Sequence, residues 1–368
     1  MNKEQRIQKI QAGLRRKKLD ALLISQPHNR RYLSGYSAVD HDIGESAGVL
    51  LIPAQNAPIL LTDFRFQMQA EQEVAGMQVM LYSKGLLPLL QKLLPDLHIQ
   101  RLAFESHYTL HSVVTKREDV LGKTGITLHP EDGIVEEMRL IKDEEEINKL
   151  RRSVLLNEKV FEEVYQNIEP GQTEIDIALA LHTTMLKKGA EGPSFEAIVA
   201  TGSRSALPHA VPGNVKIKKN QPLMIDMGLI LDGYCSDMTR TFVLKKAKKK
   251  FMKIHRLVRK AQLAAIDSIR SGVSAASIDK IARTIITNGG YGKQFGHALG
   301  HGVGLAVHEG PGLSSRNRKH LRTGMIITVE PAIYLPGWGG IRLENMIVVR
   351  EDGCEVLNQN RTWLDSYN

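Results

Sequence analysis

The chain has 368 residues, 42% of them hydrophobic, and its 49 Lys and Arg outnumber its 40 Asp and Glu to give a net charge of +9. This length and apolar content allow a large core and, at roughly 100–200 residues per domain, indicate two domains. No apolar run approaches the roughly 20 residues of a transmembrane helix, and the polar N-terminus is unlike a signal peptide. We therefore expect a soluble, cytoplasmic protein with no membrane partner.

The first 130 residues predict an α/β domain. A helical apolar period covers residues 3–18, and helical patterns recur near 64–74 and 86–94. Short apolar runs that end in turn signals predict strands at 21–25, 47–52, 59–63, 78–81 and 101–104. This half contains no glycine-rich phosphate-binding loop, and its Asp and His residues are scattered, so by itself it does not indicate a chemistry.

Residues 131–368 predict a second domain in which helices and strands are mixed. A charge-rich helical segment at 132–165 opens this domain. The later elements are helices at 173–189, 249–271 and 277–288 and hydrophobic strands at 195–201, 222–230, 234–244, 325–335 and 340–350. Because these elements do not alternate as strict βαβ units, the pattern favours an α+β fold.

Two features that point to other functions are weak. The basic cluster at 245–250 lies between a predicted strand and an amphipathic helix and lacks interleaved aromatic residues, so we interpret it as a solvated loop and expect no nucleic-acid partner. The two cysteines, Cys235 and Cys354, are too few for a disulfide scaffold or a thiolate metal cluster. We interpret Cys235 as a small strand residue rather than a nucleophile.

Four acidic residues and one histidine of the second half lie in apolar or glycine-rich stretches: Asp226, Asp237, His301, Glu330 and Glu344. Carboxylates in such surroundings are costly unless a cation neutralises them. Taken singly, each acid could simply cap the edge of a sheet. Taken together, four carboxylates and one imidazole are a ligand set for two divalent transition metals.

Two predicted hairpins bring the acids together. Asp226 and Asp237 are 11 residues apart (237 − 226) around a turn signal at 231–233, so we expect them roughly opposite each other. Glu330 and Glu344 are 14 residues apart (344 − 330) around a second, glycine-rich turn. The similarity of the two segments predicts a pseudo-twofold site with the metals at its centre.

The motifs around these residues resemble those of the prolidase and aminopeptidase P group of "pita-bread" metallopeptidases, which also includes methionine aminopeptidases and creatinase. The matching segments are Asp226-Met-Gly, Tyr234-Cys-Ser-Asp237-Met-Thr-Arg-Thr241, His297-x-x-x-His301-Gly-Val-Gly-Leu-x-Val-His308-Glu309, Val329-Glu330-Pro331 and Gly340-Ile-Arg342-Leu-Glu344-Asn. Asp20-Ala-Leu-Leu-Ile and Asn29-Arg-Arg-Tyr32-Leu-Ser-Gly35-Tyr resemble the N-terminal creatinase/prolidase domain. The resemblance implies an α+β pita-bread catalytic domain at 131–368 and an α/β creatinase-like domain at 1–130.

The resemblance also implies how the ligands share two metal ions. Asp226 would hold one ion, His301 and Glu330 the other, and Asp237 and Glu344 would bridge both. A water between the ions would lose a proton near neutral pH and attack an amide carbonyl. Manganese or cobalt is expected and zinc is the alternative, because carboxylate-rich sites accept several metals.

Four residues carry the catalytic roles that the resemblance implies. Glu330 is expected to move the proton to the leaving nitrogen. His308 is expected to hydrogen-bond the substrate and stabilise the tetrahedral oxyanion. His209 would line the opposite wall, and Arg342 would orient the acidic ligands. The alternatives are a core histidine at 308 and an ordinary loop residue at 209, while His297 either supports the site or only packs.

The implied activity is hydrolysis of the bond between an N-terminal residue and proline by a homodimer that uses two divalent metals. A prolidase acting on Xaa-Pro dipeptides is the first expectation, and an aminopeptidase P acting on longer peptides is the alternative. A creatinase-like or non-catalytic member is a distant alternative, because such members lose ligands that are intact here. Prolidases often have arginine directly after the proline of the His308-Glu-Gly-Pro segment, but this sequence has Gly312, which leaves Arg316 or Arg318 to grip a dipeptide carboxylate.

Overall fold

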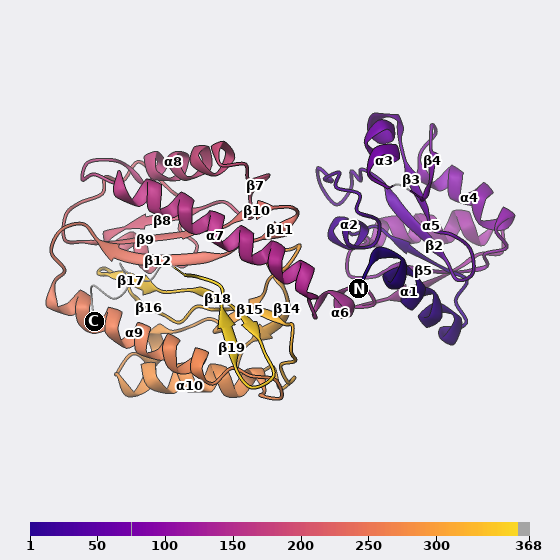
Figure 1. Ribbon diagram of the computed structural model, residues 1–368. Helices are drawn as coiled ribbons and strands as arrows, with labels where there is room; N and C mark the ends of the chain where they lie inside the picture. The colour runs from indigo at the N-terminus through magenta and orange to yellow at the C-terminus, as the bar shows by residue number, and fades with distance from the viewer. Residues whose placement is uncertain (75, 360–368) are drawn as a thin grey trace. The chain divides into compact units, whose positions relative to one another are not determined.

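The computed structural model describes residues 1–74 and 76–359, and the chain divides into two compact units, Met1–Arg139 and Leu140–Asn368 (Figure 1). The sequence boundary at 130 falls inside strand β6 (Thr127–Glu131), which pairs with β5 (Arg101–Glu105) along its whole length. The four-residue helix α6 (Glu136–Arg139) follows β6. The N-terminal unit therefore extends past residue 130 to the end of this helix.

The N-terminal unit contains more elements than the sequence patterns predict. Its elements are α1 (Lys3–Lys17), β1 (Ala21–Ile24), α2 (Pro27–Ser34), β2 (Val49–Pro53), β3 (Ile59–Thr62), η1 (Phe64–Phe66), α3 (Gln67–Glu73), β4 (Gln78–Leu81), α4 (Leu86–Asp96), β5, α5 (His111–Gly122), β6 and α6. The predicted strands are all present. Helices α2 and α5 and strand β6 were not predicted, because their apolar periodicity is interrupted by polar residues.

One six-stranded sheet, with the order β4-β3-β2-β1-β5-β6, organises the N-terminal unit. Strands β1, β5 and β6 are parallel to one another, and β3 is parallel to β4. Strand β2 runs antiparallel to both β1 and β3, so the other five strands all point the same way. Their carboxyl ends therefore meet at one edge of the sheet, and the α/β prediction for this unit is confirmed.

The C-terminal unit combines short antiparallel sheets with two pairs of long helices. Its elements are α7 (Glu144–Gln166), α8 (Glu174–Lys187), β7 (Gly192–Pro193), β8 (Ile198–Thr201), η2 (Gly202–Ala206), β9 (Pro222–Met227), β10 (Leu229–Leu231), β11 (Tyr234–Cys235), β12 (Met238–Val243), α9 (Lys249–Asp267), α10 (Ala275–Asn288), η3 (Gly292–Gln294), β13 (Gly300–Gly302), β14 (Glu309–Leu313), β15 (Ile326–Val329), β16 (Ala332–Leu335), β17 (Gly339–Arg342), β18 (Asn345–Val349) and β19 (Cys354–Val356). Figure 1 shows α7 and α8 on one side of the strands and α9 and α10 on the other. This arrangement confirms the α+β prediction.

The four long strands predicted in the C-terminal unit are each broken into two. Strands β11 and β12 are separated by Ser236 and Asp237, and β15 and β16 by Glu330 and Pro331. Strands β17 and β18 are separated at Glu344 and the residue before it. Three of the predicted acidic ligands therefore lie at interruptions of the ladder, where the backbone turns aside and the carboxylates can converge.

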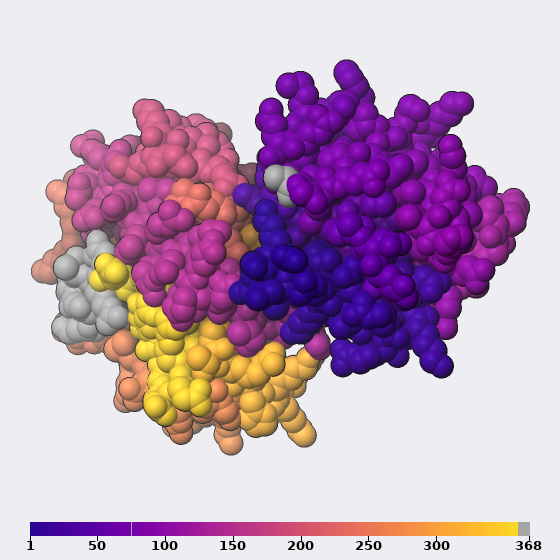
Figure 2. Space-filling model, turned by 45° about the vertical axis from the view of Figure 1, so that its right-hand side comes forward, coloured from indigo at the N-terminus to yellow at the C-terminus, as the bar shows by residue number. Residues whose placement is uncertain are grey.

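Helix α7 connects the beginning and the end of the C-terminal unit. Arg151 of α7 lies 2.6 Å from Glu355 of β19, and Figure 2 shows the yellow C-terminal segment on the surface beside the magenta helix. On its buried face, α7 carries Phe161, whose ring meets Phe242 of β12 edge-on at 6.1 Å. Within the described residues, no helix is long and apolar enough to cross a membrane.

Candidate metal centre

The first hairpin places two carboxylates on one face of a sheet. Asp226 of β9 is paired with Thr239 of β12. Asp237 lies two residues before Thr239, so it is diagonal to Asp226 across the hairpin. The turn of this hairpin is the predicted one, with Asp232 at φ 51° and Gly233 at φ 80°. These left-handed conformations suit a two-residue hairpin turn, which favours Asp-Gly at its centre.

The second hairpin presents the other two carboxylates and is joined to the first. Val329 pairs with Asn345, and the ladder resumes between β16 and β17 beyond an interruption. Glu330 and Glu344 lie opposite each other in that interruption. The backbone N–H of Glu344 donates to the carbonyl oxygen of Thr239 at 3.1 Å, so the two hairpins meet at the site.

His301 reaches the acids from β13, a strand that packs unusually close to its neighbours. A Cβ atom at Gly300 would lie 2.0 Å from the carbonyl oxygen of Thr328, and one at Gly302 would lie 2.0 Å from that of Gly310. Only glycine allows these approaches. Glycine is therefore needed at both positions because β13 packs closely against β14 and β15.

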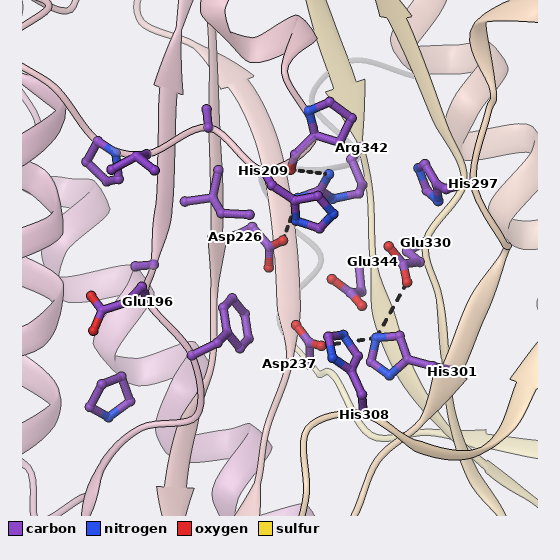
Figure 3. A pocket seen from close by; sticks show the side chains of 18 of the residues that line it. Glu196, His209, Asp226, Asp237, His297, His301, His308, Glu330, Arg342 and Glu344 are labelled. Carbon is purple, nitrogen blue, oxygen red and sulfur yellow. Dashed lines mark hydrogen bonds and ion pairs between the residues drawn. The ribbon is translucent and has the colours of Figure 1, made fainter. Parts of the chain in front are cut away.

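The side chains of these residues converge in a buried cluster (Figure 3). Ligand atoms of Asp237, His301 and Glu344 all lie within 4.8 Å of one another. His301 Nε2 is 3.5 Å from an oxygen of Asp237 and 3.5 Å from one of Glu330. His301 Nδ1 lies 3.1 Å from the carbonyl oxygen of Gly302 and carries the proton, so the lone pair of Nε2 faces the acids.

The electrostatics of the cluster reflect burial and the mutual repulsion of its acidic groups. Burial, with the charges of the neighbouring acids, raises the pKa of Asp237 and of Glu330 well above the ordinary range. Burial and Asp226 raise the pKa of Glu344 to about 7. Burial lowers the pKa of His301 to about 4, so the imidazole is neutral and can act as a ligand.

The donor set fits divalent cations. One carboxylate oxygen of Asp226 and one of Glu344 are buried and have no hydrogen-bond partner. Buried carboxylate oxygens are normally satisfied, and those that are not call for an ion. The set as a whole offers four carboxylates and a neutral imidazole. These are the oxygen and nitrogen ligands that divalent transition metals use in carboxylate-rich sites.

Arg342 is a buried cation beside the cluster. Its Nη2 lies 2.5 Å from Asp226, its Nε donates to the Thr239 hydroxyl at 3.1 Å, and its Nη1 donates to Tyr334 at 2.6 Å. Nη1 also donates to the carbonyl oxygen of Pro208 at 3.1 Å. Arg342 therefore fixes the orientation of Asp226 and anchors the turn that carries His209.

A cavity of about 940 Å³ opens beside the acids. All the metal ligands and catalytic residues that the sequence predicted line it. His308 lines it from the loop after β13, with its ring edge-on to that of His301 at 4.3 Å between centroids. His209 lines it from an exposed turn. Figure 3 shows His209 beside Arg342 and Asp226, and His308 beside Asp237 and His301. Both histidines face the cavity, so neither is a core residue of the fold.

His297, which the sequence left unassigned, also lines the cavity. Its Nδ1 lies 2.7 Å from the Ala298 carbonyl oxygen, and its Nε2 lies 3.2 Å from the Tyr334 hydroxyl. Burial lowers the pKa of His297 to about 4, so the ring is neutral. Arg342, Tyr334 and His297 thus form a chain of hydrogen bonds along one wall.

Sequence reasoning missed Tyr334 and the residues of the opposite wall. Tyr334 lies in an apolar strand and was counted with its hydrophobic neighbours, although it is the one hydroxyl-bearing residue of β16. Phe195, Ile198 and the exposed Glu196 line the far side of the cavity. The signal for these three was weak, because nothing in the order of the sequence places them near the acids.

Gly312, Arg316 and Arg318 are not among the described residues that line the cavity. Gly312 is exposed in β14, and Arg316 and Arg318 are exposed beyond it. Among the described residues that line the cavity, Arg342 is the sole arginine or lysine. Neither Arg316 nor Arg318 therefore reaches the cavity as a carboxylate clamp.

The sequence matches metallopeptidase family M24 over residues 148–351 and the Creatinase/Prolidase N-terminal domain over residues 6–141. It is 33% identical to the Xaa-Pro dipeptidase of Pyrococcus horikoshii over 96% of this chain and 97% of that protein. The structure is similar to an Xaa-Pro dipeptidase from Bacillus anthracis, with a TM-score of 0.91, 34% identity and 98% of each chain covered. It is also similar to an X-Pro aminopeptidase from Thermotoga maritima, with a TM-score of 0.85, 37% identity and 93% and 96% of the two chains covered.

Proposed function

The chain belongs to metallopeptidase family M24, with a Creatinase/Prolidase N-terminal domain before a pita-bread catalytic domain, and we propose that it is a two-metal peptidase that cleaves the bond between an N-terminal residue and proline. The observation that carries the proposal is the convergence of four carboxylates and a neutral imidazole beside a cavity. Relatives that cover almost the whole chain and are named as Xaa-Pro peptidases support the substrate class.

Five residues hold the metal ions in this proposal. Asp226 would hold one ion, His301 and Glu330 would hold the other, and Asp237 and Glu344 would serve as ligands of both. The buried, unpartnered oxygens of Asp226 and Glu344 support these assignments. When bound, two divalent ions lower the pKa of water and polarise the carbonyl of the scissile amide. Manganese or cobalt fits the carboxylate-rich set, and zinc is the alternative.

Glu330 moves the proton in the proposed reaction. Its Oε1 receives a single long hydrogen bond of 3.4 Å from the Thr328 hydroxyl, and its side chain faces the cavity. This weak partner leaves the carboxylate free to take a proton from the attacking water and to deliver it to the leaving nitrogen. The N–H of Glu330 donates to the carbonyl oxygen of Leu299 at 2.8 Å and fixes the position of the group.

His308 stabilises the charge that develops on the carbonyl oxygen. Among the described residues, none forms a hydrogen bond with its imidazole, so an N–H remains for the substrate. Contact with the ring of His301 places this donor beside the cluster without making it part of the ligand set. A donor in this place acts on the transition state more than on the bound substrate.

The wall opposite the cluster receives the proline ring. The nitrogen of proline is tertiary and has no N–H, so recognition depends on the shape of the ring. His209, Phe195 and Ile198 line the cavity and supply flat and apolar surface for it. Arg342 holds Asp226 and the turn of His209 in one arrangement, and so acts as a positioning residue for both sides of the site.

We infer that tripeptides are also substrates, which keeps aminopeptidase P as the second candidate activity. Gly312 offers no cation to the carboxylate of a dipeptide, and the similarity to an X-Pro aminopeptidase supports this view. A missing charge-assisted contact of this kind corresponds to about 1.5–3 kcal/mol, or about ten- to a hundredfold in selectivity. We therefore expect kcat/KM for Ala-Pro to exceed that for Ala-Pro-Ala by less than a thousandfold.

The test uses purified protein loaded with Mn²⁺ and four compounds: Ala-Pro, Ala-Pro-Ala, Met-Ala-Ser and creatine. Hydrolysis of the first two supports the proposal. Hydrolysis of Met-Ala-Ser or of creatine alone, or no turnover with any metal, contradicts it. Asp237→Asn should remove most activity and reduce the metal content, whereas Asp119→Asn, on the exposed face of α5, should change neither. Light scattering and cell fractionation test the proposed homodimer and cytoplasmic location.

A further inference from the structure

The N-terminal unit contains a cavity of about 310 Å³ at the edge of its sheet where the parallel strands end. Ser25 follows β1, Asp63 follows β3, and Tyr82 follows β4, and all three line the cavity. Tyr108 lines it from the segment after β5. The volume is at the lower end of the range for small-molecule sites, which is about 300–1,000 Å³.

The topology of the sheet favours a ligand at this edge. From β1 the chain builds β2, β3 and β4 outward on one side, then returns to place β5 and β6 on the other side of β1. Chain segments leaving the carboxyl ends of β1 and β5 therefore diverge, and a crevice forms between them. Ligands in open α/β sheets bind at such switch points.

Arg117 of α5 lines this cavity as a buried cation that lacks a counterion. The residue is only 9% exposed, and no ion pair or hydrogen bond joins its guanidinium to any described residue. Burial is the one cause that lowers its pKa, to about 10, so it remains charged. A buried guanidinium without a partner is costly, and structures normally pair it.

Ser25 provides a second polar group that lacks a partner in the same cavity. Its hydroxyl oxygen is buried and forms no hydrogen bond with any described residue. The N–H groups of Ser25 and Gln26 both donate to Glu105, at 2.6 and 2.7 Å. The hydroxyl therefore lacks a partner, whereas the backbone beside it does not.

The rim of the cavity carries an excess of negative charge. Asp63 and Glu45 both pair with Arg65, each at 2.9 Å, so two carboxylates share one guanidinium. Asp40 is matched by the buried Arg30, also at 2.9 Å. The cavity therefore has one unmatched positive charge in its wall, at Arg117, and one negative charge in excess at its rim.

We propose that this cavity binds a zwitterion of the α-amino acid class, with its carboxylate on Arg117 and the Ser25 hydroxyl and its ammonium group towards Glu45 and Asp63. Guanidinium and carboxylate form two parallel charge-assisted hydrogen bonds. A phosphate dianion would meet three carboxylates with one unmatched cation, so it fits less well. This site lies within the N-terminal unit and is separate from the proposed peptidase site.

The test is isothermal titration of the full-length protein in EDTA, which removes metals from the peptidase site. We expect alanine and proline to bind, and alaninamide, acetate and inorganic phosphate to bind at least tenfold more weakly. Equal or tighter binding of acetate or phosphate overturns the proposal in favour of a simple anion site. The absence of heat with all five compounds overturns it as well. Neither result depends on turnover, so the peptidase proposal is tested independently.

Three variants locate the binding. Arg117→Met should weaken alanine binding by about ten- to a hundredfold, because it removes a charge-assisted contact. It should also raise the melting temperature of the ligand-free protein, because it removes a buried charge without a partner. Ser25→Ala should weaken binding about threefold and provides the same test if the first variant does not fold. Arg101→Met, exposed on β5, should bind like the wild type, and unchanged binding by Arg117→Met and Ser25→Ala would place the ligand elsewhere.

Discussion

Replacing Glu344 with glutamine should make the metal-free protein more stable at high pH. Glu344 is 2% exposed, and burial and Asp226 raise its pKa from the ordinary 4.5 to about 7. A carboxyl whose folded-state pKa is raised contributes stability below the unfolded value of 4.5 and loses it as pH rises through 7. The difference of about 2.5 pKa units corresponds to about 3 kcal/mol at pH 8.5 and to under about 1 kcal/mol at pH 5.

Glutamine has the shape of glutamate and no charge, so Glu344→Gln avoids this loss. Its side-chain oxygen can still accept the hydrogen bond that the Thr239 hydroxyl donates at 2.7 Å. In EDTA, the variant should therefore exceed the wild type by about 3 kcal/mol at pH 8.5, and the gap should shrink towards pH 5. With Mn²⁺ at pH 8.5 the order should reverse, because a ligand that binds only the folded state stabilises it and the variant has lost one carboxylate ligand.

The assay is urea unfolding followed by tryptophan fluorescence. Trp338 packs against the hydrophobic core of the C-terminal unit, so its fluorescence reports on the unfolding of that unit. Glu196→Gln is the matched control, since Glu196 is an exposed carboxylate that lines the same cavity. The control should follow the wild type at every pH. A metal-free Glu344→Gln protein that is less stable than the wild type at pH 8.5 would refute the reasoning.

Three other substitutions test the loop between β13 and β14 and a buried histidine. His308→Ala should retain both metals and lower kcat by about two to four orders of magnitude, as steady-state kinetics with metal analysis will show; an unchanged rate contradicts the role. Gly304→Ala places a Cβ 2.2 Å from Glu309, which Lys142 binds at 2.6 Å, and should cost about 1–3 kcal/mol in urea unfolding, whereas Gly353→Ala meets no atom within 4 Å and should cost little. His255 is buried, which lowers its pKa to about 4, so stability is present above pH 6.5 and is lost as pH falls towards 4. The free energy of unfolding of His255→Leu should therefore fall by about 2 kcal/mol less than that of the wild type between pH 7.5 and pH 5. Equal falls in the two proteins would contradict this cause.

The acidic residues of the candidate site could be singled out in the sequence because a charged residue in an apolar stretch breaks a local rule. Asp226 and Glu344 are charged residues in apolar surroundings, which is costly enough that a sequence rarely contains such residues without a reason. The turn at Asp232 and Gly233 was predictable because few residues adopt its left-handed conformation. Burial of both acids and the predicted hairpin turn followed in the structure.

Other features depend on tertiary packing and leave little trace in the sequence. The strand breaks at Asp237 and Glu330 were missed, because apolar periodicity continues through both positions and only the partner strands show where pairing stops. Tyr334 was missed for a related reason, because only the folded structure brings its hydroxyl into contact with Arg342 and His297. Arg117 lies in a polar segment for which no helix was predicted, and only the fold shows that it is buried.

The two hairpins that meet through the hydrogen bond between Glu344 and Thr239 are far apart in the sequence, and this separation determines when a metal ion can bind during synthesis. The carboxylates that converge at the site span 118 residues of the chain (344 − 226). During synthesis, the first hairpin leaves the ribosome with Asp226 and Asp237 while the strands that carry Glu330 and Glu344 do not yet exist. A nascent chain stalled before residue 330 should therefore acquire no high-affinity ion, and metal capture should be a late event that follows the pairing of the two hairpins.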